Sequence, residues 1–221
     1  MQPDTNLFLW HTTPLFHVPY LLGTGALLSA ARLSGGEHPI CPRPSAIRRK
    51  TKLGLADFVH LSPTPRTPLL RDKQAKGYTH VLLSFDRTAT LALPDVALLR
   101  FNTKRWAHRD DFVPVRGHEE KAAIWAAHES GKFPSLEVLI PQALPLIPFA
   151  AGLHVARSET AVLLETVIKA LRMSAPPLFV SPDRFPLASE SGGEHDVATL
   201  EYFAACRDAG EVLPPPPLPF D

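Results

Sequence analysis

The sequence has little cysteine and no long hydrophobic run. Only Cys41 and Cys206 occur among its 221 residues, which is too few for a disulfide framework or a thiolate metal site. No apolar run reaches the roughly 18 residues that a membrane helix needs. The first residues also lack the basic and apolar regions of a secretory signal. These absences favour a globular protein of the reducing cytoplasm.

A strong charge bias is also absent. The formal net charge is +1, so there is no overall attraction to nucleic acid. Locally, residues 42–52 and 100–109 are both basic, and the second stretch interleaves its cations with Phe101 and Trp106. Either stretch alone is more typical of a solvated face. Two of them, one with aromatic residues, make nucleic-acid binding a hypothesis to test.

Proline, by contrast, is abundant, with 24 residues that cluster. PICPRP and SPTPRTP predict extended loops, because each proline biases the preceding residue away from the helical conformation. PPPPLPF (214–220) predicts a polyproline II tail. We therefore expect one domain over residues 1–211, followed by a proline-rich tail over residues 212–221.

The hydrophobic pattern predicts a mixture of strands and helices. Strands are expected at residues 7–10, 56–61, 79–86 and 135–141, with a further short strand from residue 178. Helices are expected at residues 15–31, 118–130, 158–173 and 195–207. These segments do not alternate as regular βαβ units. The order therefore favours an α+β fold with a mixed or antiparallel sheet.

Glu137 is the most unusual single residue. It stands in SLEVLIP (135–141), a segment otherwise suited to burial. Simple alternation would turn Glu137 toward water, whereas a core-facing carboxylate would need a partner. A third interpretation is a carboxylate held on a rigid strand and aimed into a cleft. There it could stabilise developing positive charge or orient a hydroxyl group.

His11, Thr12 and Thr13 follow the first expected strand directly. Polar residues at such a junction can meet a ligand, but they are also common in turns. Gly23 and Gly25 then interrupt the expected helix. The pair could instead let a ligand approach closely, although G-T-G is not a dinucleotide-binding fingerprint.

Several common catalytic motifs are excluded. His118-Glu119 is not part of an H-E-x-x-H motif, because residue 122 is alanine. The sequence contains neither a phosphate-binding G-x-x-x-x-G-K-[ST] motif nor a G-x-S-x-G motif. The ten histidines lack metal-ligand spacing, so we expect no metal site.

Four sequence blocks resemble, in order, the ADP-ribosyltransferase superfamily, and within it the DNA ADP-ribosyltransferase toxins called DarT. WHTT with LFHVPYLLGTGALLS is similar to the opening strand, His-x-Thr and helix ending in Gly-Leu-Leu-Ser. Arg48-Arg49-Lys50 and LADFVHLSPTPRTPLL resemble the arginine, Asp-Tyr-Val strand and Pro-Arg-Ser-Pro loop. THVLLSFD is the third block, and SLEVLIP resembles the strand that carries the catalytic glutamate. Together the blocks span residues 7–141.

The chain also departs from that pattern. His60, Leu61 and Ser62 stand where the family usually has aromatic residues, and Leu69-Leu70 replaces Met-Leu. These departures affect the expected base and sequence preference more than the expected fold.

The resemblance implies an NAD-dependent mono-ADP-ribosyltransferase with an ADP-ribosyltransferase-like mixed sheet, NAD as substrate and no metal. It further implies a toxin that modifies a base in single-stranded DNA and has an antitoxin that removes the modification. The implied catalytic residues are Glu137, Arg49 and Arg48. The implied NAD contacts are His11, Thr12, Thr13, Gly25 and Leu28, and the implied nucleic-acid contacts are Lys50, Lys52, Arg66, Arg105 and Trp106.

Two alternatives remain open. An NAD-dependent RNA 2′-phosphotransferase would share the fold but should show several arginines and a second histidine around a phosphate. A non-catalytic nucleic-acid-binding domain would use the basic stretches and the proline tail without cleaving NAD.

Overall fold

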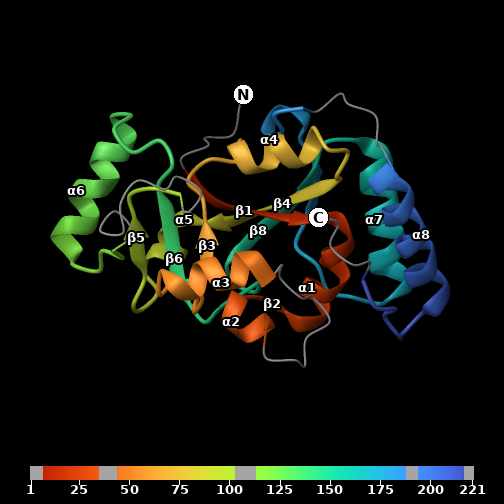
Figure 1. Cartoon of the computed structure of the whole chain (residues 1–221). Helices are drawn as coiled ribbons and strands as arrows, with labels where there is room; N and C mark the ends of the chain where they lie inside the picture. Colours follow the sequence, from red (N-terminus) through yellow and green to blue (C-terminus); the bar gives the residue numbers. More distant parts are fainter. Residues whose placement is uncertain (1–6, 35–43, 103–112, 188–193, 217–221) are drawn as a thin grey trace.

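The computed structural model describes residues 7–34, 44–102, 113–187 and 194–216. Within them helices and strands are mixed, which confirms the expected α+β class. Figure 1 shows the strands in the middle of the molecule with helices at both ends. The largest sheet has the order β1 (Phe8–Pro14), β4 (His80–Asp86), β8 (Ala150–Val155), β9 (Leu178–Val180). A second sheet has the order β3 (Phe58–Leu61), β6 (Glu137–Pro141), β5 (Ala97–Leu99), and β2 (Ala26–Leu28) pairs with β7 (Ala143–Pro145).

The four-stranded sheet forms much of the core. β4 lies between β1 and β8, antiparallel to both, and is buried at every position except Asp86. Its nearly continuous apolar sequence is what a strand covered on both faces requires. At one end of the molecule, α7 (Ser158–Ala170) lies beside α8 (Glu194–Ala209) (Figure 1). Both helices contribute buried apolar side chains to the same core cluster: Leu164, Val167, Tyr202, Phe203 and Cys206.

The two larger sheets meet at one point. Trp10 on β1 and Ser62, just after β3, exchange two backbone hydrogen bonds of 2.8 Å. β3 therefore runs beside β1, and β3 in turn pairs with β6. This junction brings the strand that begins with Glu137 close to the strand that contains His11.

The expected helix at residues 15–31 is wrong. The segment divides into a 3-10 turn (Leu15–His17), α1 (Val18–Thr24), β2 and α2 (Ala30–Leu33). α1 ends because Gly25 adopts a left-handed φ of 70°, and its N–H donates to the carbonyls of Leu21 and Leu22. The next three residues then pair with β7, 115 or more positions further along the chain.

We expect Gly25→Ala to lower the free energy of unfolding by about 1–2 kcal/mol, because L-residues pay roughly that cost in the left-handed region. A Cβ at Gly25 would meet no atom within 4 Å, so conformation alone accounts for the loss. Gly23→Ala is the matched control. Its Cβ would lie 3.6 Å from Met173 Cε in ordinary contact, and alanine favours the helix. Urea unfolding should give opposite signs for the two variants.

Other elements either match those predicted from the sequence or were not predicted. The helices expected at residues 118–130, 158–173 and 195–207 are confirmed as α6 (His118–Glu129), α7 and α8. β1 is longer than expected and extends through Pro14. The structure adds α3 (Pro44–Lys52), α4 (Pro68–Gln74), α5 (Arg87–Leu91) and a 3-10 turn (Pro182–Arg184). α4 begins where Thr67 accepts a hydrogen bond from the Leu70 N–H and Pro68 follows as the first helical residue.

The described part of the proline-rich tail contacts α1. The Tyr20 hydroxyl donates a hydrogen bond to the Pro214 carbonyl, and Leu213 packs against the core. The division into a domain over residues 1–211 and a tail over residues 212–221 stays a prediction.

Within the described ranges, no helix combines the length and the apolar character needed to cross a bilayer.

Candidate active site

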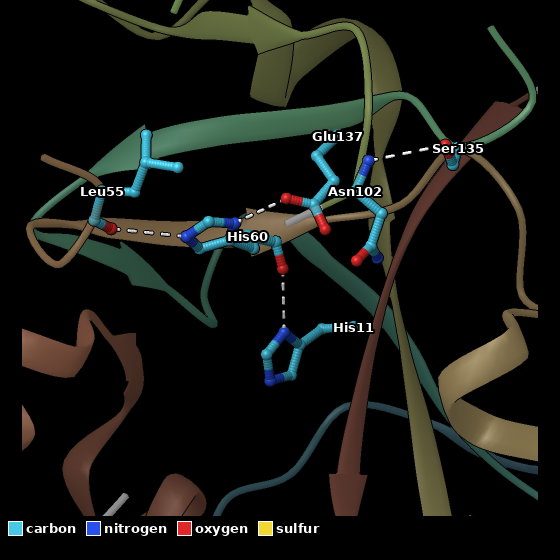
Figure 2. Close-up of polar contacts among 6 residues, drawn as sticks. All are labelled: His11, Leu55, His60, Asn102, Ser135 and Glu137. Carbon is cyan, nitrogen blue, oxygen red and sulfur yellow. Dashed lines mark hydrogen bonds and ion pairs between the residues drawn. The ribbon is translucent and has the colours of Figure 1, made fainter. Parts of the chain in front are cut away.

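Glu137 is buried and has a specific partner. Glu137 is the first residue of β6 and is only 8% exposed. Its Oε2 lies 2.8 Å from Nδ1 of His60 on β3 (Figure 2). His60 pairs in register with Leu139, so the contact crosses diagonally between neighbouring strands. A buried carboxylate needs such a partner. The expectation that simple alternation would turn Glu137 toward water is therefore not what the structure shows.

His60 also connects Glu137 to β1. The backbone carbonyl of His60 accepts a hydrogen bond of 3.1 Å from Nδ1 of His11. Figure 2 shows His60 between Glu137 and His11, with its ring toward Glu137 and its backbone carbonyl toward His11. Three strands from two sheets thus converge on one cluster.

The protonation of His11 follows from its surroundings. A carbonyl oxygen can only accept a hydrogen bond, so Nδ1 of His11 carries the proton. Burial lowers the pKa of His11 to about 4, so the ring is neutral at pH 7 and Nε2 has no proton. His11 therefore offers an acceptor to a ligand hydroxyl.

The pleat of β1 separates the two threonines after His11. Successive side chains of a strand point to opposite faces, so Thr13 shares the face of His11 and Thr12 shares that of Trp10. Thr13 is 4% exposed, whereas Thr12 is half-buried. His11 and Thr13 are therefore the pair that one ligand could meet together.

Lys50 is coupled electrostatically to this cluster. It lies in the last turn of α3, where burial lowers its pKa while the charge of Glu137 acts to raise it. The charge of Lys50 in turn contributes to lowering the pKa of His11. The sequence assigned Lys50 to nucleic acid, whereas the structure places it within electrostatic reach of Glu137 and His11.

The remaining predicted residues are more dispersed. On α3, Arg48 and Lys52 are exposed and Arg49 is half-buried. Arg66 donates a hydrogen bond of 2.9 Å to the Asp183 carbonyl. The other predicted contacts are a half-buried Leu28 on β2, an exposed Gly25, and Arg105 and Trp106, which lie outside the described residues.

The sequence interpretation missed the role of His60. His60 was noted only as a departure from the family pattern. One signal was available, because His60 stands in F-V-H-L just as Glu137 stands in L-E-V-L. A lone ionisable residue in each of two apolar strands would be satisfied if the strands paired, but the sequence does not state which strands pair.

A second histidine cluster lies elsewhere in the four-stranded sheet. His154 on β8 contacts Ser84 Oγ (2.9 Å) and Ser181 Oγ (3.0 Å), and Phe179 stacks on its ring. Burial lowers the pKa of His154 to about 4. Ser84 is only 2% exposed, so this cluster belongs to the polar interior of the sheet.

In the described ranges, no group of three or more His, Cys, Asp or Glu side chains is arranged to hold a metal.

Buried neutral histidines make stability depend on pH. Burial lowers the pKa of His11, His80 and His154 to about 4 from an ordinary 6.5. Between these values the unfolded chain binds protons that the folded chain does not, so stability rises with pH in this window. We expect urea unfolding to show a progressive loss of stability as the pH falls from 6.5 to 4. His80→Phe should flatten that dependence, and an unchanged slope would contradict the expectation.

Comparison with known proteins identifies the fold. No family model and no curated protein matches the chain in sequence. Among solved structures, Thermus sp. 2.9 DarT in complex with ADP-ribosylated ssDNA matches with a TM-score of 0.62 at 17% identity, covering 83% of this chain and 97% of that one. The same Thermus protein in complex with NAD+ gives 0.58 at 17% identity, covering 84% and 100%.

A second organism gives a similar result. Thermosipho africanus DarTG in complex with ADP-ribose matches with a TM-score of 0.60 at 19% identity, covering 81% of this chain and 51% of that one. The order of blocks recognised in the sequence and the tertiary structure thus point to the same relatives. At these identities the likeness establishes the architecture: the chain has the fold of the DarT ADP-ribosyltransferase structures.

Proposed function

We propose that this protein is an NAD-dependent mono-ADP-ribosyltransferase that modifies a base in single-stranded DNA. The observation that carries the proposal is the buried carboxylate of Glu137, joined through His60 to His11 on a chain with the DarT fold. The solved relatives of this fold were captured with NAD+, with ADP-ribose and with ADP-ribosylated ssDNA.

The chemistry of the transfer fits the cluster. Breaking the bond between nicotinamide and ribose leaves positive charge on the sugar, which a fixed carboxylate stabilises. Oε2 of Glu137 is held by His60, and Oε1 takes no part in that contact. A base nitrogen then forms the new bond to the ribose carbon as nicotinamide departs with the bonding electron pair. The carboxylate of Glu137 accepts the proton that the base loses.

NAD binding draws on neighbouring residues. Unprotonated Nε2 of His11 can accept a hydrogen bond from a ribose hydroxyl, and Thr13 lies on the same face of β1. Arg49 or Arg48 would neutralise the pyrophosphate, since a guanidinium pairs well with phosphate oxygens. Gly25 and Leu28 would form part of the wall of the NAD-binding site. We assign Lys52, Arg66, Arg105 and Trp106 to the nucleic acid, as the sequence suggests, and Lys50 to the electrostatics of the site.

The biological role in the proposal is that of a cytoplasmic toxin with a cognate antitoxin. It is supported by the likeness to Thermosipho africanus DarTG, and by the sequence blocks shared with the toxin family. The antitoxin would be a hydrolase that removes the ADP-ribose.

The deciding experiment is mass spectrometry of mixed-sequence oligonucleotides after incubation with the protein and NAD. We expect release of nicotinamide and DNA heavier by one ADP-ribose unit. Mass added to protein alone, or loss of phosphate from an RNA that carries a 2′-phosphate, would replace the proposal with another NAD-dependent transferase. DNA binding without NAD binding would identify a non-catalytic module instead.

A further inference from the structure

We infer that His60 is a positioning residue, which fixes one oxygen of Glu137 and thereby directs the other toward the NAD ribose. The inference rests on the proposed function and deepens it. It concerns a residue at which this chain differs from the pattern of the family it resembles, because His60 stands where aromatic residues are usual.

The first support is geometric. His60 Nδ1 lies 2.8 Å from Glu137 Oε2, a distance typical of a charge-assisted hydrogen bond. Both residues stand on paired strands, and both side chains are nearly buried, with 12% and 11% exposure. A carboxylate attached to a rigid strand by such a bond has one oxygen engaged, and its plane is fixed.

The second support is the position of His60 in the cluster. Its side chain contacts Glu137, while its backbone carbonyl accepts the Nδ1 proton of His11. One residue therefore aligns both groups that the reaction would use: the acid that faces the ribose carbon and the imidazole that faces a ribose hydroxyl. A small displacement at residue 60 would disturb both at once.

The third support is the arrangement of charge. The second ring nitrogen of His60, Nε2, lies 3.4 Å from the Leu55 carbonyl. Both ring nitrogens thus face acceptors, the Glu137 carboxylate and the Leu55 carbonyl. The titratable groups around the ring are Glu137 on β6, Lys50 on α3 and the neutral His11 on β1. The contacts with Glu137 and with the Leu55 carbonyl hold the His60 ring from two sides and fix its orientation.

The test compares His60→Phe and His60→Gln with the wild type in steady-state transfer to DNA. Phenylalanine keeps an aromatic ring at this position but removes the N–H group, whereas glutamine supplies an N–H donor. We expect His60→Phe to reduce kcat about 10- to 100-fold, the range that loss of one hydrogen bond to a charged group implies, with KM for NAD changed less than about 3-fold. His60→Gln should recover part of the loss in kcat, because it restores a donor to Glu137.

The matched control is His80→Phe. His80 is also a buried histidine that hydrogen-bonds a backbone carbonyl, that of Tyr78, but it has no contact with Glu137 among those the structure shows. It should leave kcat and KM for NAD unchanged, which separates positioning from general loss of stability. If His60→Phe and His60→Gln both behave like the control, the inference is overturned.

A measurement without substrate tests the contact itself. Nitrogen-15 NMR of the histidine rings should show a changed chemical shift for the His60 ring nitrogens in Glu137→Gln, because the variant replaces the charged acceptor of the 2.8 Å hydrogen bond with a neutral one. Unchanged His60 ring shifts in this variant would overturn the inference even if the enzyme is active. If the wild type neither cleaves NAD nor modifies DNA, the proposed function fails, and the role of His60 in that reaction fails with it.

Discussion

Glu137→Gln is expected to reduce ADP-ribosyl transfer by about 10³-fold or more. The change preserves shape but removes the charge that would stabilise the developing cation on the ribose, a loss worth about 10²–10³-fold for one preorganised electrostatic group. It also removes the group that would accept the proton from the base, which adds a further factor. The measurement is single-turnover transfer to an oligonucleotide with NAD in excess.

NAD binding separates a catalytic from a structural effect of that change. Because the carboxylate acts on charge that forms only in the transition state, Glu137→Gln should leave the Kd for NAD within about 3-fold of the wild-type value. Glu165→Gln is the control, since Glu165 lies exposed on α7 in an i,i+4 ion pair with Lys169. A Glu137→Gln protein that still transfers at the wild-type rate would remove the catalytic assignment of Glu137.

His11→Phe should weaken NAD binding about 10- to 100-fold, and it should reduce kcat/KM by a similar factor. The phenyl ring fills the same space, but it offers no acceptor to a ribose hydroxyl and leaves the His60 carbonyl without its donor. Unpaired buried polar groups cost about 1–3 kcal/mol, which corresponds to that range. Isothermal titration with NAD provides the measurement.

The pH dependence of NAD binding provides an independent check on His11. Burial lowers the pKa of His11 to about 4, so the accepting form of the ring is present above that value and is lost below it. NAD affinity of the wild type should therefore be constant from about pH 6 to 8, whereas a fall in affinity through pH 6.5 would indicate an ordinary, solvent-exposed histidine. His80→Phe again serves as the control for loss of a buried imidazole, and it should bind NAD normally.

Local patterns in the sequence predicted much of the fold. Apolar runs or helical periodicity located β3, β4, β6, α6, α7 and α8 to within a few residues, because such patterns report burial of the segment that contains them. Gly23 and Gly25 indicated an interruption within residues 15–31, but the strand that follows Gly25 was not predicted. β2 exists only because it pairs with β7 far along the chain, and no local pattern encodes that partner.

The candidate site shows the same division between local and long-range information. The sequence by itself singled out Glu137 as a lone acid in an apolar strand, and its likeness to a known family connected that acid with His11 and NAD. Only the tertiary structure decided that Glu137 contacts His60, 77 residues away, and that Lys50 faces the same cluster. The physical reason is that strand pairing and helix docking set which buried charges meet, and those contacts depend on the whole chain rather than on neighbouring residues.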